Sequence, residues 1–339
     1  MTGTVPRTRI SGATLPGYEP GAGDGRWTPP HEIALPHPAI EELPSFVRRI
    51  DSQDLAFGLR HYNGSLALHD GRIFMAYRVE SFRSVSRVGV CELDHSFNVI
   101  RDQLLEPGLD NPETHIEDPH LATAGGRLVV IVSNVVRSFP VVCRQRILEL
   151  DPASLTILEE IPATFGNIRG VEKNWTPFEL PDSTLGFVYK QRPRTVIQVA
   201  TGQGWTVPEL PVGPANSSLS GRTGPVRITP DLYLEFVGGH IPLPGRGTRG
   251  TRYWFGALAF EARTPHKVVG TTGTDPLVWA SEASPTIFNH TPAGGHPVCI
   301  MPAGCFVRSG VAFVACGVND SYNVILRFEV ADLLKRMGL

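Results

Sequence analysis

The chain has 339 residues, which is enough for one large domain or for two of ordinary size. Its 31 basic and 33 acidic side chains give a formal net charge of −2, so it lacks the basic surface that binding to a nucleic acid or to an anionic membrane requires. Composition and charge favour a neutral or small polar partner. We expect neither a nucleic acid nor a membrane as partner.

Cysteine usage and the N-terminal sequence bear on the compartment. The five cysteines are odd in number and have no CxxC spacing, which is not the pattern of a disulfide framework or a zinc site. We interpret them as reduced core thiols. The chain begins without an apolar core followed by a small-residue cleavage site, and it has no run of about 18 apolar residues. We therefore expect a soluble, unexported, cytoplasmic protein.

Residues 1–45 are rich in Gly, Pro and Thr and cannot bury enough apolar surface to fold alone. We predict an extended N-terminal arm over residues 1–45 and one folded domain over residues 46–339. The arm is ordered only if it lies on the domain or on a neighbouring subunit. A homo-oligomer formed through the arm is therefore a hypothesis, which the composition leaves open.

One pattern recurs along the rest of the chain: an apolar strand, a turn of Gly, Asp, Asn or Ser, and a second apolar strand, as in a hairpin. Its copies are SLALHDGRIFMAYRVE, HLATAGGRLVVIVSN, TPFELPDSTLGFVYKQ, GPVRITPDLYLEFVGG and GCFVRSGVAFVACGVN. A four-stranded blade takes about 40 to 50 residues, and IPLPGRGTRGTRYW supplies an insertion for the longest interval. The sequence predicts an all-β, five-bladed β-propeller, with a two-sheet sandwich or a barrel as the alternative. A helical period occurs only in EVADLLKRM, which predicts a short C-terminal helix.

Polar side chains beside apolar strands are the candidate site, because propellers place such groups around the central axis. HIEDPHLA puts Glu117 and Asp118 just before a strand, where a carboxylate can point into a pocket; an ordinary acidic turn is the alternative. VEKNWTPFEL puts Lys173, Asn174 and Trp175 ahead of another strand. A charge, an amide and a flat ring suit a sugar or a phosphate, although Trp175 could instead lie in the core.

Three further clusters have the same character. Arg222 and His240 bracket a hairpin and could donate to an oxyanion, although each alone is more typical of a structural role. Asp320 ends an apolar strand and could bind sugar hydroxyls or cap a loop. Asn63 and Arg78 lie at the two ends of the first hairpin, where Arg78 could also pair with a nearby carboxylate. The sequence has no metal-binding spacing and no nucleotide-binding motif, so we expect no metal or organic cofactor.

Taken in order, five segments resemble the five-bladed propellers of glycoside hydrolase family 130. The segments are NGSLALHDGRIFMAYRVE, EDPHLATAGGRLVVIVSN, EKNWTPFEL, GRTGPVRITPDLYLEFVGGH and CGVNDSYNV, and the resemblance covers residues 55–330. That family contains inverting phosphorylases that cleave β-mannosides with phosphate, together with β-mannosidases. The EKNW segment is similar to a related group of mannosyltransferases and phosphorylases.

The resemblance implies roles for individual residues. Asp118 matches the acid that protonates the glycosidic oxygen, by relay through a sugar hydroxyl. The residues in segments that hold the mannosyl unit are Asn63, Arg78 and Asp320. The residues near segments that hold phosphate are Lys173, Arg222 and His240. The resemblance thus predicts transfer of a mannosyl group to or from phosphate, with inorganic phosphate as co-substrate and a sugar or oligosaccharide as the other substrate. Glu117, Asn174 and Trp175 complete the predicted substrate-binding set.

Two departures from the family pattern keep other functions open. The family has EDPR where this chain has His120 after Pro119, and its Ala-rich stretch before the last Asp is CGVND in this chain. A weakened anion site would suit a β-mannoside hydrolase, a nucleotide-sugar mannosyltransferase or a non-catalytic carbohydrate-binding propeller.

The position of a second carboxylate distinguishes hydrolysis from phosphorolysis. An inverting hydrolase needs a carboxylate base besides its acid, so Glu235, Glu179 or Glu113 would have to face Asp118. A phosphorylase needs only the acid, because phosphate is itself the nucleophile. That function predicts instead that the three cationic side chains converge on one anion.

Overall fold

The structure is a computed structural model that describes residues 43–50, 54–55, 60–80, 85–106, 115–138, 141–161, 172–207, 212, 218–221, 223–242, 251–279 and 299–339. These residues belong to one compact unit, His37–Leu339. The first strand of the described residues begins at Phe46. Residues 1–42 of the predicted arm lie outside the described residues, so the arm remains a prediction.

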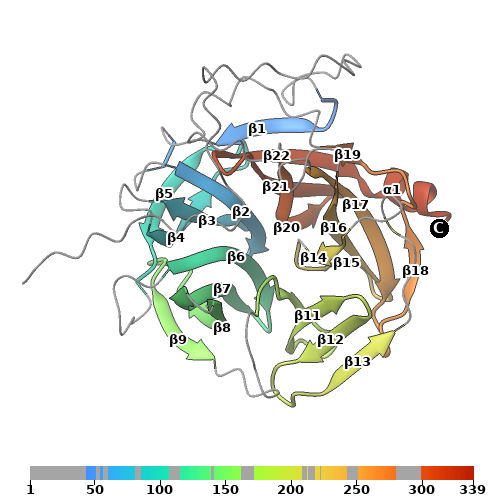
Figure 1. Ribbon diagram of the computed structural model, residues 1–339, viewed down its shortest axis with the longest axis horizontal. Coiled ribbons are helices and arrows are strands. Elements are labelled where there is room, and N and C mark those ends of the chain that lie inside the picture. The colour runs from blue at the N-terminus through green and yellow to red at the C-terminus, as the bar shows by residue number, and fades with distance from the viewer. Residues whose placement is uncertain are drawn as a thin grey trace, which may run out of the picture. The chain divides into compact units, whose positions relative to one another are not determined.

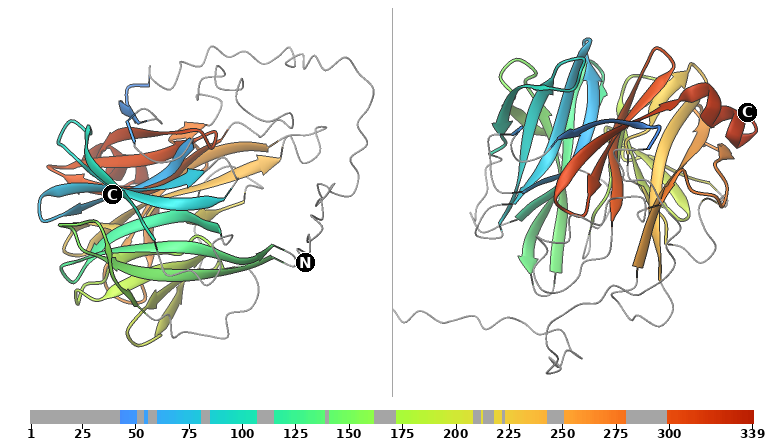
Figure 2. Two further views of the ribbon diagram at one scale, coloured as in Figure 1. Left: turned by 90° about the vertical axis from the view of Figure 1, so that its left-hand side faces the viewer. Right: turned by 90° about the horizontal axis from the view of Figure 1, so that it is seen from above.

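The described strands form five antiparallel sheets that stand as blades around a ring (Figure 1). The predicted all-β, five-bladed propeller is therefore confirmed. Figure 2 shows the strands running between the two faces of the ring. No helix within the described ranges is long and apolar enough to cross a membrane.

Blades 1 to 3 follow the chain from the centre outward. Blade 1 consists of β2 (Arg60–His69), β3 (Arg72–Glu80), β4 (Ser86–Leu93) and β5 (Val99–Leu104). Blade 2 consists of β6 (His115–Ala124), β7 (Arg127–Ser138), β8 (Val141–Leu150) and β9 (Ile157–Ile161). Blade 3 consists of β10 (Thr176–Glu179), β11 (Leu185–Gln191), β12 (Arg194–Gln198) and β13 (Gly204–Val207).

Blades 4 and 5 depart from this plan. Blade 4 consists of β14 (Ser220–Gly221), β15 (Val226–Thr229), β16 (Leu232–Pro242), β17 (Thr251–Glu261), β18 (Val268–Thr271) and β19 (Val278–Trp279). Both β14 and β15 pair with β16, so the inner strand is interrupted. Blade 5 consists of β20 (Ile300–Arg308), β21 (Val311–Val318), β22 (Tyr322–Glu329) and β1 (Phe46–Ile50). The first described strand therefore completes the last blade and closes the ring.

The turns between the first two strands of a blade explain why the hairpins form where the sequence predicts them. The two-residue turns Asp70–Gly71, Gly125–Gly126 and Ser309–Gly310 have positive φ at both positions. Such turns match the twist of the flanking strands and favour Gly, Asn or Asp. The DG, GG and SG pairs in the repeated pattern therefore fix the start of three blades.

Alternation along the strands builds the core between blades. In β3, Met75 and Tyr77 pack in a cluster with Phe306 of blade 5, whereas Phe74 and Ala76 pack in a cluster with blade 2. A strand turns successive side chains to opposite faces, so each blade seals against both neighbours. All five cysteines are buried and free, as predicted.

The C-terminal helix α1 (Val330–Met337) is the short helix that the sequence predicts, and it lies at the rim of the ring (Figure 2). It buries Val330 and Leu333 against the blade 4 and blade 5 core. Gly338, with φ 79°, ends the helix, because glycine adopts the left-handed conformation without steric cost.

The inner strands begin at one face of the ring and end at the other, and we call the middle of each face a mouth (Figure 2). A cavity of about 220 Å³ lies where these strands end, lined by all five blades, for example by Leu68, Thr123, Phe178, Arg227 and Val307. The candidate catalytic residues lie where the inner strands of blades 1 to 3 begin. The cavity and the candidate site are therefore separate features.

Candidate active site

Three blades begin their inner strand with the same irregular backbone. Asn63 in β2, Asp118 in β6 and Asn174 immediately before β10 have φ values of 52°, 49° and 62°. This left-handed conformation costs a non-glycine residue about 1–2 kcal/mol, and Asn and Asp visit it most readily. In β2 and β6 it coincides with a bulge in the pairing to the next strand. Because a bulge re-aims side chains, one backbone device sets the direction of three polar groups at equivalent positions.

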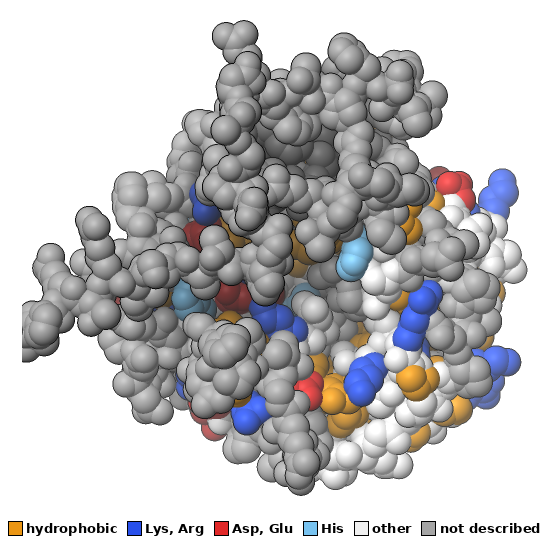
Figure 3. All heavy atoms as spheres, viewed as in Figure 1, with side chains coloured by type: hydrophobic (Ala, Val, Ile, Leu, Met, Phe, Trp, Pro, Cys, Tyr) orange, Lys and Arg blue, Asp and Glu red, His pale blue; other side chains and the backbone are white. Residues whose placement is uncertain are grey.

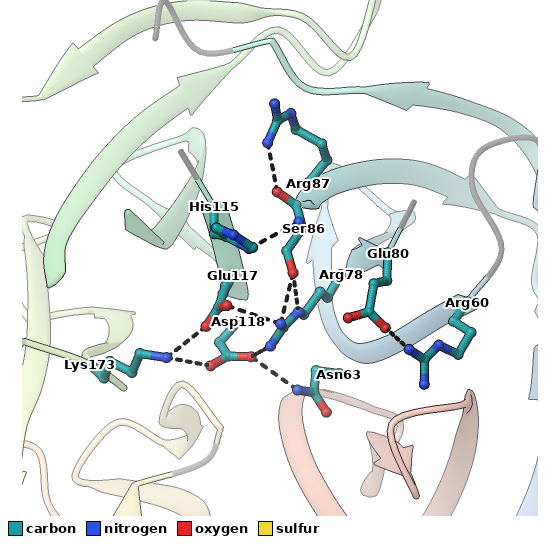
Figure 4. Close-up of polar contacts among 10 residues, drawn as sticks. All are labelled: Arg60, Asn63, Arg78, Glu80, Ser86, Arg87, His115, Glu117, Asp118 and Lys173. Carbon is teal, nitrogen blue, oxygen red and sulfur yellow. Dashed lines mark hydrogen bonds and ion pairs between the residues drawn. The ribbon is translucent and has the colours of Figure 1, made fainter. Parts of the chain in front are cut away.

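Asp118 is surrounded by cations and hydrogen-bond donors. Its Oδ1 accepts a hydrogen bond from Asn63 Nδ2 at 3.0 Å and lies 3.4 Å from Arg78 Nη1, while its Oδ2 lies 3.8 Å from Lys173 Nζ (Figure 4). Burial alone would raise the pKa of the carboxyl, but Arg78, Lys173 and Asn63 together outweigh it and hold the pKa below its ordinary value. Asp118 is therefore an ionised carboxylate near neutral pH, with its side chain 21% exposed.

Glu117 shares the same two cations. Its Oε1 lies 3.0 Å from Arg78 Nη2, and its Oε2 lies 2.7 Å from Lys173 Nζ. Burial lowers the pKa of Lys173, but the charges of Asp118 and Glu117 outweigh it and raise that pKa. Two carboxylates from blade 2 thus face a guanidinium from blade 1 and an ammonium from the start of blade 3. Acidic and basic side chains lie side by side near the middle of the face shown in Figure 3.

The guanidinium of Arg78 is fixed from its other side. Ser86 Oγ accepts hydrogen bonds from Arg78 Nε at 3.1 Å and from Nη2 at 2.8 Å. The ring of Tyr62 lies under the guanidinium, 5.1 Å from its centre. Burial lowers the pKa of Arg78, but the negative charges around it, Asp118 first among them, outweigh burial and raise that pKa. Arg78 therefore remains a fixed cation that orients both carboxylates.

Asp320, which the sequence proposes for binding a sugar, lies near enough to this cluster to act on it through its charge. It follows β21 with φ 49°. Burial is the main cause that raises the pKa of Tyr62, and the negative charge of Asp320 adds to this effect. The charge of Asp320 also acts with that of Asp118 to raise the pKa of Arg78 against burial. Tyr62, only 3% exposed, was missed by sequence reasoning. The sequence position of Tyr62 could have indicated that it belongs to the site, because Tyr62 directly precedes Asn63 just as Glu117 directly precedes Asp118.

Asn323 is a second residue that sequence reasoning missed. Its buried side chain accepts a hydrogen bond from Gly64 N at 2.7 Å and donates one to the carbonyl oxygen of His61 at 3.2 Å. These bonds join β22 of blade 5 to the bulge that carries Asn63. Asn323 therefore fixes the backbone that presents the Asn63 amide to Asp118.

Trp175 does not offer the sugar-binding ring that the sequence predicts. It is 1% exposed and stacks on Phe187 at a centroid distance of 4.6 Å. Its Nε1 donates to Glu172 Oε2 at 3.2 Å. A buried ring presents no face to a ligand, so Trp175 anchors the segment that carries Lys173. Asn174, in the same segment, is partly exposed and remains a candidate for substrate binding.

The predicted phosphate cradle is described only in part. Arg222 lies outside the described residues. The His240 ring approaches Ser218 Oγ at 2.7 Å through Nδ1 and packs against Tyr253 in blade 4. Lys173 instead contacts Glu117 and Asp118. Convergence of the three cations on one anion therefore remains a prediction.

Neither described candidate for a hydrolytic base faces Asp118. Glu235 is fully buried and pairs with Arg194 Nη1 at 2.7 Å, which joins blade 4 to blade 3. Glu179 lines the cavity at the opposite mouth, where its Oε2 accepts a hydrogen bond from Gly125 N at 2.7 Å. Glu113 lies outside the described residues. Within the described ranges, no group of three or more His, Cys, Asp or Glu side chains is placed to hold a metal ion.

The fold of the chain is similar to that of several solved structures, which include mannoside phosphorylases. No family model matches the chain, and no curated protein matches it. The mannose phosphorylase MPT-4 from Leishmania mexicana, in complex with phosphate, is 15% identical with a TM-score of 0.56, over 83% of this chain and 87% of that chain. The β-1,2-mannobiose phosphorylase from Listeria innocua is 14% identical with a TM-score of 0.61, over 87% and 99%.

A further similar structure comes from the GH130 family of mannoside phosphorylases, which contains glycoside hydrolases that target β-1,2-mannosidic linkages in Candida mannan. It is 14% identical to this chain with a TM-score of 0.60, over 86% of this chain and 96% of the other. At these identities the similarity establishes a shared fold, and that fold is the one implied by the sequence resemblance.

Proposed function

We propose that the protein is a carbohydrate-active enzyme that transfers a mannosyl group to or from phosphate, with Asp118 as the proton-transferring residue. The observation that carries the proposal is the carboxylate of Asp118, aimed by a strained bulge and contacted by Asn63, Arg78 and Lys173 from two other blades. Strained backbone and buried, charge-coupled groups are concentrated at functional sites. The phosphorylases with the same fold support the choice of reaction.

The geometry suits acid–base catalysis in both directions of an inverting phosphorolysis. In the degradative direction a phosphate oxygen attacks the anomeric carbon while the protonated form of Asp118, the minor form near neutral pH, gives its proton to the departing sugar oxygen and becomes a carboxylate. The glycosidic C–O bond breaks and α-mannose 1-phosphate forms. In the synthetic direction the Asp118 carboxylate takes up the proton of the acceptor hydroxyl as phosphate leaves. The ionised form held by Arg78 and Lys173 is the form that synthesis requires.

The places of Glu235 and Glu179, the two described candidates for a hydrolytic base, support phosphorolysis over hydrolysis. An inverting hydrolase needs a base across the sugar from the acid. Glu235 is tied to Arg194 between blades, and Glu179 lies at the opposite mouth. A phosphorylase has no such requirement. The proposed reaction uses inorganic phosphate as co-substrate and no metal or organic cofactor, with Arg222 and His240 as further phosphate ligands.

The test is synthesis from α-mannose 1-phosphate with glucose, mannose or N-acetylglucosamine as acceptor, followed by phosphate release. We expect release to require an acceptor and to fall about 10²–10⁴-fold in Asp118→Asn. The matched control is Glu159→Gln, which changes an exposed carboxylate on β9 and should leave the rate unchanged. A folded protein that releases no phosphate with any acceptor would contradict the proposal and favour a hydrolase, a nucleotide-sugar transferase or a binding propeller.

A further inference from the structure

The carboxylate of Glu117 occupies the donors of both cations in the candidate site. Each of its oxygens has its own partner, Arg78 Nη2 at 3.0 Å and Lys173 Nζ at 2.7 Å. The side chain is 13% exposed, so these pairs are only partly screened by water. Figure 4 shows the Glu117 carboxylate between the two cations, beside Asp118. The two positive charges of the cluster are therefore already paired in the structure.

The charge balance sets a condition for binding an anion. Glu117 and Asp118 carry two negative charges, and Arg78 and Lys173 carry two positive ones. A phosphate that approaches Lys173 meets a cluster with no net positive charge, in which two carboxylates lie within ion-pair distance of the same ammonium. Like charges at such distances repel strongly in a partly buried site. Phosphate therefore binds well only where a carboxylate gives up its cation.

The two carboxylates differ in what holds them. Asp118 has a short side chain on a left-handed backbone, and Asn63 Nδ2 binds its Oδ1. Its distance to Lys173 Nζ is 3.8 Å, whereas the distance from Glu117 is 2.7 Å. Glu117 has one more rotatable bond, and the contacts described for its carboxylate are the ion pairs with Arg78 and Lys173. Movement of the Glu117 side chain would therefore release Lys173 for another anion while Asp118 stays in place.

We propose that Glu117 is a resident anion that competes with phosphate for Lys173 and Arg78, and so sets the affinity of the site for phosphate. The proposal rests on the proposed function and assigns Glu117 a role distinct from acid catalysis and from binding a sugar. A carboxylate in this place keeps the cations oriented between turnovers and lets the anion leave after the reaction. The affinity of the site for phosphate is then set by the difference in free energy between phosphate and the Glu117 carboxylate as partners of the same donors.

The experiment is a calorimetric titration of the full-length protein and of Glu117→Gln with inorganic phosphate. The Gln side chain keeps the shape and removes the negative charge, so we expect phosphate to bind about tenfold more tightly, because a repulsive charge near the anion is lost. Glu159→Gln is the control and should bind phosphate as the unsubstituted protein does. Unchanged or weaker binding by a Glu117→Gln protein with native thermal unfolding would overturn the proposal.

A second variant covers the case in which Glu117→Gln does not fold. Glu117→Asp keeps the charge and shortens the side chain by one methylene, so it reaches Lys173 less well, and we expect a smaller gain in phosphate affinity of about twofold. No gain in this variant would overturn the proposal in that case. If neither the variants nor the unsubstituted protein bind phosphate, the phosphorylase function fails as well. If all bind it equally, only the role of Glu117 fails.

Discussion

Asp118 owes its charge state to its neighbours, and this has a consequence for the pH dependence of synthesis. Every contact described for its oxygens comes from a donor or a cation: Asn63, Arg78 and Lys173. As a base, Asp118 acts only when ionised, so the rate of synthesis should fall as the pH drops through its pKa. That pKa is held below its ordinary value, so the loss should occur only at acidic pH.

Substitution of Lys173 tests this coupling. Lys173→Gln removes one of the charges that lower the pKa of Asp118, so the pKa should rise and the acidic limb of the profile should move to higher pH. The measurement is kcat/KM for synthesis against pH, with Lys267→Gln, an exposed lysine of blade 4, as control. An acidic limb that stays in place while the rate falls would mean that Lys173 acts only through substrate binding.

The individual site residues show how far sequence reasoning reaches. Glu117, Asp118, Arg78 and Asn63 lie in segments that the sequence singles out, and the structure brings them within hydrogen-bond or ion-pair distance. Whether the Trp175 ring faces a pocket or the core could not be predicted from the local sequence, because a large aromatic ring is common in both places. Its burial depends on Phe187, a partner that the local sequence does not identify.

The bulge that begins β2 depends on a side chain from another blade. Asn323 in β22 is fully buried and pairs with the backbone at Gly64 and His61. In Asn323→Ala both backbone groups lose their partner, which should lower the free energy of unfolding by about 2–4 kcal/mol. Chemical denaturation measures the loss. Asn98→Ala removes an exposed side-chain hydrogen bond to Asp94 and should cost less than about 1 kcal/mol. Equal costs would show that the bulge does not depend on Asn323.

A second contact between elements links blades 1 and 2. Glu92 in β4 accepts hydrogen bonds from Arg72 and Arg101, and both arginines donate to the carbonyl oxygen of Pro152 in blade 2. The hydrogen bond from Arg72 is the main cause that lowers the pKa of Glu92 to about 2. A lowered pKa contributes stability above the ordinary value near 4.5, and that stability is lost as the pH falls toward 2.

Glu92→Gln should therefore be less stable than the unsubstituted protein by about 1–3 kcal/mol at pH 7, since both arginines are partly exposed and screened. The difference should shrink as the pH falls from 4.5 toward 2, where the carboxylate becomes protonated. Urea denaturation of both proteins across this range measures it. A difference that does not change with pH would mean that shape, and not charge, links the two blades.

At the scale of elements, turns between neighbouring strands could be predicted, whereas pairings between distant strands could not. Turns such as Asp70–Gly71 allow a hairpin to be predicted, because their positive φ values favour Asp, Asn and Gly at these two positions. The pairing of β1 with β22 could not be predicted, because the two strands lie at opposite ends of the chain. The interruption between β14 and β15 could not be predicted either. It is visible only in the pairing of both strands with β16, which the sequence does not give.

The strand that closes the ring is connected to the candidate site through a series of contacts. In the pairing of β1 with β22, Ile50 lies opposite Asn323, the residue that fixes the bulge carrying Asn63. Asn63 in turn binds Asp118 in blade 2. A continuous set of contacts therefore runs from the strand that closes the ring, through blades 5 and 1, to the proposed proton-transferring residue. Loss of closure should reach the site even though β1 itself lies at the outer edge.

Two truncations separate the closing strand from the predicted arm. Removal of residues 1–42 leaves β1 intact and should preserve both cooperative thermal unfolding and synthesis. Removal of residues 1–50 deletes β1, strips the fully buried Ile50 from its core cluster and leaves the outer edge of β22 unpaired. An exposed edge strand invites aggregation, and an open ring loses the packing between its first and last blades. We expect the longer truncation to unfold at markedly lower temperature, to aggregate in light scattering and to lose activity.

A peptide of residues 43–54 added in excess should restore part of the stability by adding the missing strand. Native unfolding and activity in the longer truncation would show that the other three strands of blade 5 close the ring without β1.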